Sequence, residues 1–495
     1  MSMLTRRGLL GALAGAALCS AAPRALARTK PSSILYISSD EHNPGYLGSA
    51  GHPFARTPNL DRFFAQSLEL RGVHTSSPVC APTRQSWLTG LLPMEHGQLG
   101  NAYVFDDDAT SLVTGLEGYD TACFGKLHTN AEERDGRFGF QRLLSTKSPD
   151  WDATLKRYRV GSDGGAYDPQ DAAILRSLPP PVAHKFLGKV RGSVQGSADW
   201  VLLQEALGWL QERSPERPFF CYVSFRFPHY PFDLPEDFYY AFKPAELDEP
   251  PPIEHDWSSR LGGAYQMRKR GWQSLTREQT QLLRARYLGA VSYLDWLVGQ
   301  LLDNLAAMGL AEDTLVVYSS DHGDMGGNKG LWLKDVMYDD VTRKPTAIRL
   351  PGRLPAGTRS SELMGDIDLL PTVFGLAGAP LRRPLTGADR SAALLNGHTE
   401  AEATFAYDFI NPDSGPQMSM VRSRGWKFVH YEGSFFPKGG AELYKLDEDP
   451  GETRNLAADP GYAGVADELL GLLRQRRVGL RAPAKVEKKE DTEGD

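Results

Sequence analysis

The sequence predicts an α/β fold in which helices flank a large, mostly parallel sheet and a small C-terminal subdomain carries an antiparallel sheet. Two observations support this prediction. Strand-like and helical segments alternate through the first three-quarters of the chain, which is typical of a parallel sheet covered by helices. From about residue 400, short β-type runs follow one another without intervening helices, which is typical of antiparallel strands.

Three strands of the large sheet are predicted from apolar runs at 34–37, 219–223 and 314–318. Each run leads directly into polar and ionisable side chains. Active sites of open α/β sheets lie outside the carboxyl ends of their strands. We therefore expect the functional site where these three strands end.

A long amphipathic helix is predicted before the third of these strands. Thr276 and Gln279 have the spacing of a capping box, and Gly309 is expected to close the helix. Between them, apolar residues recur at helical spacing: Leu283, Tyr287, Val291, Leu294, Val298, Leu301 and Leu305. We expect this stripe to pack in the core.

The antiparallel sheet is predicted from four runs, at 405–409, 418–422, 426–431 and 442–446. A helix near 462–475 is expected to follow it. We place a catalytic domain at 30–395, the C-terminal subdomain at 396–480 and a charged, disordered tail at 484–495. Two irregular stretches, from about 145 to 195 and from 233 to 275, are expected to be surface insertions that act as lids or substrate walls.

Residues 1–27 have the features of a twin-arginine (Tat) signal peptide. Arg6-Arg7 precede a short apolar stretch rich in Ala and Gly, and Ala25-Leu26-Ala27 has the small residues of a cleavage site. The apolar stretch is too short to span a membrane well. We therefore expect the Tat export machinery to carry the protein to the periplasm or the outside, with no stable membrane span.

The composition is that of a globular enzyme. The chain has 495 residues, of which 41% are hydrophobic and 24% charged, and its net charge of -7 argues against nucleic acid as a partner. It has 4 cysteines, one of them in the signal peptide, so no disulfide framework is expected. Cys123 and Cys221 lie in apolar, strand-like runs, whereas Cys80 lies in a predicted loop.

The segment Cys80-Ala81-Pro82-Thr83-Arg84, followed by Leu88-Thr89-Gly90, resembles the signature of the type I sulfatases. The resemblance covers roughly residues 30–460, and its motifs are most similar to those of choline-sulfatase-like bacterial sulfatases. It implies the alkaline-phosphatase-like fold. It also implies that a formylglycine-generating enzyme oxidises Cys80 to formylglycine, an aldehyde whose hydrate attacks the sulfur atom with Arg84 in support.

Acidic and imidazole side chains at two strand ends predict a divalent metal site. Asp40 and Glu41 follow the first strand, and Asp321 and His322 follow the third. The resemblance implies this set, with Cys80 as a further ligand. Calcium is the family's usual metal, while manganese and magnesium stay open. Glu41 stands where the family commonly has Asp or Gln, so direct ligation, ligation through water and a supporting role all stay open.

Four basic side chains match further sulfatase positions. Lys126 and His128 belong to a Gly-Lys-x-His segment, whose spacing on an extended strand would point both side chains the same way. His229 follows Pro228, and Lys334 lies thirteen residues after the acid of the third strand. The resemblance implies that Lys126, His229 and Lys334 bind the substrate. It further implies that Lys334 or His229 protonates the leaving alcohol and that His128 takes up a proton as sulfate leaves.

Asn101 resembles a substrate-side asparagine of the choline-sulfatase-like branch. The implied reaction is hydrolysis of the sulfate monoester of a small molecule or saccharide. One alternative is a phosphonate monoester or phosphodiester hydrolase of the same superfamily. Lys126 and His128 favour the sulfatase, because the phosphonate hydrolase branch has uncharged hydroxyl-bearing residues in their place. A second alternative, an inactive protein that binds sulfated ligands, predicts losses among the site positions, and none is lost.

Overall fold

The computed structural model describes residues 32–104, 110–129, 138–160, 165–178, 186, 188–248, 259–379, 385–398, 401–410, 416–477 and 487–488. The predicted signal peptide and most of the predicted tail lie outside these residues. Within the tail, β19 (Glu487–Lys488) pairs with β5 (Tyr103–Val104). An exposed strand edge offers unpaired backbone groups to such a segment, and the character of the tail as a whole stays a prediction.

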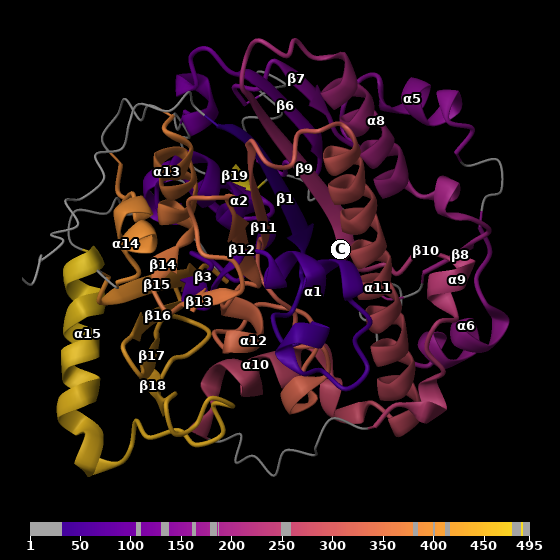
Figure 1. Cartoon of the computed structure of the whole chain (residues 1–495). Coiled ribbons are helices and arrows are strands. Elements are labelled where there is room, and N and C mark those ends of the chain that lie inside the picture. The colour runs from indigo at the N-terminus through magenta and orange to yellow at the C-terminus, as the bar shows by residue number, and fades with distance from the viewer. Residues whose placement is uncertain are drawn as a thin grey trace, which may run out of the picture.

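A mixed sheet of eight strands forms the centre of the molecule (Figure 1). Its order is β13-β2-β12-β11-β1-β9-β6-β7, in which β11, β1, β9, β6 and β7 run parallel. The strands are β1 (Ser33–Asp40), β2 (Leu68–Leu70), β6 (Asp120–Gly125), β7 (Arg142–Leu144), β9 (Phe219–Pro228), β11 (Thr314–Ser320), β12 (Thr346–Arg349) and β13 (Thr358–Ser360). The three predicted runs lie within β1, β9 and β11, and the mostly parallel sheet is confirmed.

Helices cover both faces of this sheet (Figure 1). One face packs against α1 (Pro58–Ala65), α8 (Ala198–Glu212) and α11 (Arg277–Ala307), and the other against α2 (Cys80–Thr89) and α13 (Asp366–Ala377). Alternate side chains of β1 point into the two cores, because side chains along a strand alternate between its faces. Leu35 and Ile37 belong to the first core, and Ile34 and Tyr36 to the second.

The prediction of the long helix is confirmed in α11. The side chain of Thr276 accepts a hydrogen bond from the Gln279 amide, and the Gln279 side chain accepts one from the Thr276 amide, as in a capping box. All seven residues of the predicted stripe are buried. Gly309, with φ 71°, follows the helix end in the left-handed conformation that favours glycine.

A separate antiparallel sheet of four strands forms the C-terminal part of the chain, as predicted. Its strands are β15 (Ala403–Asp408), β16 (Met418–Ser423), β17 (Trp426–Tyr431) and β18 (Gly440–Lys445). The expected helix is α15 (Ala463–Arg477), whose Leu469 and Leu473 pack against Val421, Phe428 and Leu443 of the sheet. In Figure 1 this helix lies on the outer side of the sheet. The exact domain boundaries stay a prediction.

The two expected insertions contain more helix than the irregular sequence predicts. They include α5 (Trp151–Arg157), α6 (Pro169–Arg176), α9 (Glu236–Tyr239) and α10 (Leu261–Arg270). The second and third residues of α10 are Gly262 and Gly263, which are poor helix formers. Packing explains the first of them, because a Cβ atom at Gly262 would lie 2.7 Å from the Tyr431 hydroxyl of β17. Tertiary contact thus outweighs local propensity here.

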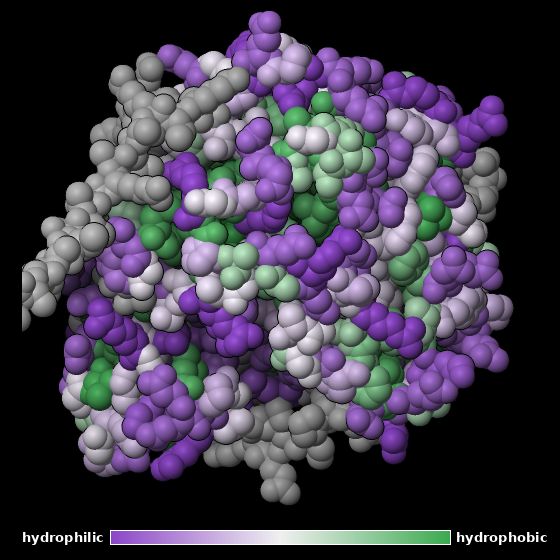
Figure 2. Space-filling model, viewed as in Figure 1, coloured by the Kyte–Doolittle hydropathy of each residue, from purple (hydrophilic) through white to green (hydrophobic). Residues whose placement is uncertain are grey.

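The remaining elements are short, namely β3 (Val73–His74), β4 (Gln98–Gly100), β8 (Val190–Arg191), β10 (Leu234–Pro235), β14 (Met364–Gly365), α3 (Pro93–His96), α12 (Asp339–Thr342) and α14 (Ser391–Asn396). Figure 2 shows a face that carries mostly hydrophilic residues, with smaller hydrophobic areas between them. Within the described ranges, every helix is too short or too polar to cross a bilayer.

Candidate active site

The predicted site residues meet where β1 and β11 end side by side. Ser39 and Ser320 are paired in the parallel register, and the Asp321 amide donates a hydrogen bond to the Ser39 carbonyl at 3.2 Å. Asp40 ends β1, and Glu41 follows it with φ 63°, a left-handed conformation that turns the chain out of the strand. The two strand ends therefore bring their acidic residues together, as the sequence predicts.

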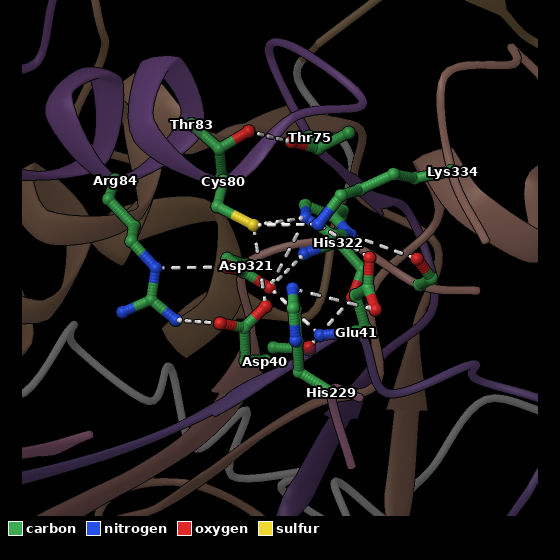
Figure 3. Close-up of polar contacts among 12 residues, drawn as sticks. Asp40, Glu41, Thr75, Cys80, Thr83, Arg84, His229, Asp321, His322 and Lys334 are labelled. Carbon is green, nitrogen blue, oxygen red and sulfur yellow. Dashed lines mark hydrogen bonds and ion pairs between the residues drawn. The ribbon is translucent and has the colours of Figure 1, made fainter. Parts of the chain in front are cut away.

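Helix α2 places Cys80 in its first turn, directly above these strand ends (Figure 3). The loop before the helix is held by Asp366 of α13, whose Oδ2 atom accepts hydrogen bonds from the Thr75 hydroxyl at 3.0 Å and the Ser76 amide at 2.6 Å. Thr75 in turn bonds to Thr83 of α2 at 2.6 Å. The role of Asp366 as an anchor is not recognisable from the sequence, because it depends on a contact between segments about 290 residues apart.

Three side chains surround the Cys80 sulfur (Figure 3). Sγ lies 2.9 Å from Lys334 Nζ, 3.2 Å from His322 Nε2 and 3.5 Å from Asp40 Oδ1. Burial, together with the negative charge of Asp40, raises the pKa of the thiol well above its usual range. The unmodified thiol is therefore a poor nucleophile in this position, since the thiolate is the reactive form.

Asp40, Cys80, Asp321 and His322 can converge on one metal ion. One ligand atom from each lies within 4.8 Å of the others, and all four residues are buried. His322 Nδ1 is hydrogen-bonded to the Gly323 carbonyl at 2.9 Å, which leaves Nε2 toward the cluster. Carboxylate oxygens and an imidazole suit a divalent cation, so the donor set fits the predicted metal.

Glu41, the fifth predicted ligand, has different partners. Its Oε1 atom lies 2.5 Å from Lys334 Nζ, and its Oε2 atom lies 3.9 Å from His229 Nε2. Burial raises the pKa of Glu41 to about 7 against the opposing charge of Lys334. The geometry favours a supporting role, in which Glu41 orients Lys334, and direct ligation by Glu41 stays a prediction.

Arg84 connects three strand ends. Its Nε atom donates to Asp321 Oδ2 at 2.9 Å, and Nη2 lies 3.5 Å from Asp40 Oδ2. Nη1 donates to the Lys126 carbonyl at 2.7 Å and to the Ser224 hydroxyl at 2.8 Å. Ser224, on β9, is a site residue that sequence reasoning missed. The alternation of side chains along the predicted strand is only weak evidence that Ser224 faces the site.

Lys126 and His229 complete the cluster. Lys126 Nζ lies 2.7 Å from Asp40 Oδ2. Burial alone would raise the pKa of Asp40, but Lys126, His229, Arg84 and Lys334 hold it well below its usual range. Burial lowers the pKa of His229 far below its usual range, against the opposing charge of Asp40.

For Lys126 and His128, the expected extended geometry is wrong. β6 ends at Gly125, whose φ is 113°, and His128 has φ 51°. A Cβ atom at Gly125 would lie 1.9 Å from the Ser224 carbonyl oxygen, so only glycine fits where the chain leaves β6 beside β9. His128 is buried, and its role stays a prediction.

Asn101 contacts the helix that carries the cysteine. Its Oδ1 atom accepts a hydrogen bond from the Ala81 amide at 3.1 Å. This amide lies in the first turn of α2, where backbone N–H groups have no partner within the helix. Asn101 therefore stabilises the start of α2 in the described structure, and its predicted contact with substrate stays a prediction.

Comparison with known proteins shows which family models and which relatives this chain matches. The family model described as Sulfatase matches residues 32–379, and a second, described as the C-terminal part of N-sulphoglucosamine sulphohydrolase, matches residues 327–479. A choline-sulfatase of Rhizobium meliloti is 29% identical over 454 residues, which cover 86% of this chain and 82% of that protein.

Two solved structures share the fold. A phosphonate monoester hydrolase of Silicibacter pomeroyi has a TM-score of 0.73 at 22% identity, covering 91% of this chain and 96% of that one. An enzyme in complex with its substrate D-glucosamine-2-N,6-O-disulfate has a TM-score of 0.68 at 20% identity, covering 94% and 100%. At these identities the likeness establishes the architecture alone, which is the large α/β sheet with a C-terminal antiparallel sheet.

Proposed function

Because the chain belongs to the sulfatase family and is a sulfuric ester hydrolase, we propose that residue 80, as formylglycine, is its nucleophile. Sulfatases in general use formylglycine and a divalent metal. The observation that carries the proposal is the convergence of Lys334, His322 and Asp40 on the side chain of Cys80. Cys123 and Cys221 instead lie in the apolar cores of the sheet.

We propose Asp40, Asp321, His322 and residue 80 as the metal ligands, with calcium as the ion. The formylglycine hydrate would supply one hydroxyl for attack on sulfur and a second for release of sulfate, and a metal held by these residues would supply positive charge. Arg84 holds Asp40 and Asp321 in place through its guanidinium. Its charge also balances the two carboxylates, which would otherwise repel each other in a buried site.

The remaining basic residues handle the substrate. Lys126, His229 and Lys334 border the nucleophile and offer positive charge or N–H donors to the sulfuryl oxygens. We assign the proton for the leaving alcohol to Lys334, because its ammonium group lies closest to residue 80. His128 is assigned the proton that is removed when sulfate is released, as the family resemblance implies.

The substrate is a sulfate ester of a saccharide or small molecule. A small molecule is supported by the choline-sulfatase, and a saccharide is kept as a candidate because D-glucosamine-2-N,6-O-disulfate is the substrate in one of the two structures that share the fold. The fold is shared with a phosphonate monoester hydrolase. The ion pair between Lys126 and Asp40 in the cluster favours the sulfatase over that activity, because the rival branch lacks this cation.

Maturation must precede folding in this proposal. The Cys80 side chain is 0% exposed, so a formylglycine-generating enzyme would have to act on the unfolded chain. Export of a folded protein by the Tat machinery would then require conversion in the cytoplasm. We propose that order of events and a periplasmic or secreted destination.

A sulfate-release assay tests the function. The matured enzyme is expected to release sulfate from aryl or saccharide sulfates, and Cys80→Ala is expected to release none. Cys221→Ala is the matched control, because Cys221 is equally buried but lies on β9 away from the cluster. Full activity of Cys80→Ala would contradict the proposal.

A further inference from the structure

A cavity of about 280 Å³ adjoins the active-site cluster on the side of Lys126 and His229. It lies between the start of α8, the end of β9 and the segment that follows β7. Ala198, Leu202 and Pro231 give it apolar walls, and the basic residue Arg226 also lines it. A cavity of this size admits a single ring with its substituents, because pockets for larger organic ligands run from about 300 to 1,000 Å³.

Two charged residues that line this cavity, Asp199 and Arg226, differ in the hydrogen bonds that they already make within the protein. The buried carboxylate of Asp199 accepts hydrogen bonds from the backbone amides of Arg226, at 3.0 and 3.2 Å, and of Phe227, at 3.3 Å. Asp199 thus fixes the end of β9. The Arg226 guanidinium donates from Nη2 to the Pro231 carbonyl at 3.0 Å. A guanidinium has five N–H donors, so this bond leaves others for a ligand.

We propose that this cavity receives the alcohol-derived part of the sulfate ester, and that Arg226 binds a second anionic group on it. The proposal rests on sulfate ester hydrolysis at residue 80. Lys126 and His229 border both the cluster and the cavity, so a sulfate held between them leaves the rest of the substrate facing this space.

The ligand chemistry follows from the donors. The planar fork of an arginine matches the paired oxygens of a carboxylate or a sulfate. A cationic substituent would instead meet the Arg226 guanidinium, while Asp199, the one carboxylate among the described residues that line the cavity, has both oxygens hydrogen-bonded to backbone amides of β9. The substrate class is therefore a ring-sized alcohol sulfate that carries a carboxylate or a second sulfate.

Two matched substrates test this assignment. Carboxyphenyl sulfate and carbamoylphenyl sulfate, each as the 3- and 4-isomers, have nearly the same shape and differ in the charge of one substituent. The wild-type matured enzyme is expected to show a higher kcat/KM for the acid than for the amide. Arg226→Gln is expected to lower that ratio about tenfold, the effect of losing one charge-assisted interaction, and Arg226→Lys to lower it less.

The control is Arg213→Gln. Arg213 caps the opposite end of α8, where its guanidinium lies 4.5 Å from the centre of the Phe219 ring, and its loss should leave the ratio at the wild-type value. Equal kcat/KM for acid and amide in the wild-type enzyme would overturn the proposal, even if no variant folds. An equal loss on both substrates in Arg226→Gln, or faster turnover of choline sulfate than of either acid, would also overturn it. No sulfate release from any substrate by enzyme with converted residue 80 would overturn the hydrolase activity itself.

Discussion

The ammonium nitrogen of Lys334 lies 2.9 Å from the sulfur of Cys80, although 254 residues separate them in the chain. The backbone around the lysine is in an unusual conformation, because Leu333 and Asp335 have φ values of 65° and 66°. Contacts with α10 hold it there, since Gln266 donates to the Asp335 carbonyl at 3.2 Å and Arg270 pairs with the Asp335 carboxylate at 3.2 Å. The cation is thus positioned beside the nucleophile before substrate binds.

Replacing Lys334 by methionine should lower kcat/KM by about 10²- to 10⁴-fold, the usual effect of losing a general acid. The loss should be larger for alkyl or saccharide sulfates than for 4-nitrophenyl sulfate, because nitrophenolate leaves without a proton. Steady-state kinetics on both substrate types measure this difference. Lys269→Met, on the exposed side of α10, is the control. An equal loss for both leaving groups would show that Lys334 is not the acid.

Metal retention should depend on Asp321 more than on Glu41. Asp321→Ala removes one of the converging ligands and should lose metal and activity together. Glu41→Gln keeps a side chain of the same shape beside Lys334 and should retain metal. Elemental analysis of the purified variants gives the metal content. A full equivalent of metal in Asp321→Ala would mean that the ligand set is wrong.

His128→Ala should allow one turnover and then stop. Attack on sulfur does not need this imidazole in the proposed sequence, whereas release of sulfate does. Rapid-quench measurement should show a burst of alcohol equal to the enzyme concentration without steady release. Continuous turnover in this variant, or a wild-type preference for a phosphonate monoester over 4-nitrophenyl sulfate, would move the assignment to the phosphonate branch.

Lys427 of β17 stabilises the junction between the C-terminal sheet and the segment that carries Lys334. It is fully buried, pairs with Asp339, and lies 2.6 Å from Glu452 Oε1. Lys427→Met would leave the buried carboxylate of Glu452 without its closest cation, while the partly exposed Asp339 keeps Arg343, and should lower the free energy of unfolding by about 3–5 kcal/mol. Thermal denaturation measures the change. Lys445→Met, at the last residue of β18, breaks the pair with the exposed Glu448 and should leave Tm unchanged. Equal Tm shifts in the two variants would contradict this interpretation.

Local patterns predicted much of this structure, whereas long-range contacts did not follow from them. The capping box at Thr276 and the apolar runs of β1, β9 and β11 depend on neighbouring residues, so the sequence predicts them directly. The convergence on Cys80 could be predicted because each member follows a strand end or a known motif. The direction of Glu41 could not, because it depends on a left-handed turn and on Lys334, which lies far along the chain.

The same limit applies to β6 and α10. Only glycine fits at the end of β6, because the Ser224 carbonyl of the neighbouring strand leaves no room for a side chain at position 125, and this contact cannot be read from sequence spacing. α10 forms despite two glycines because it packs against Tyr431 of the C-terminal sheet. In both places a contact between distant segments decides the local conformation.

The chemical state of residue 80 is the most direct test of the account. Peptide mass spectrometry of active enzyme, quantified against the specific activity of the same sample, measures how much of residue 80 is aldehyde and how much is thiol. We predict that activity rises in proportion to the aldehyde fraction and extrapolates to zero when only thiol is present. Full activity in a sample whose residue 80 is entirely unmodified cysteine would contradict the proposed nucleophile.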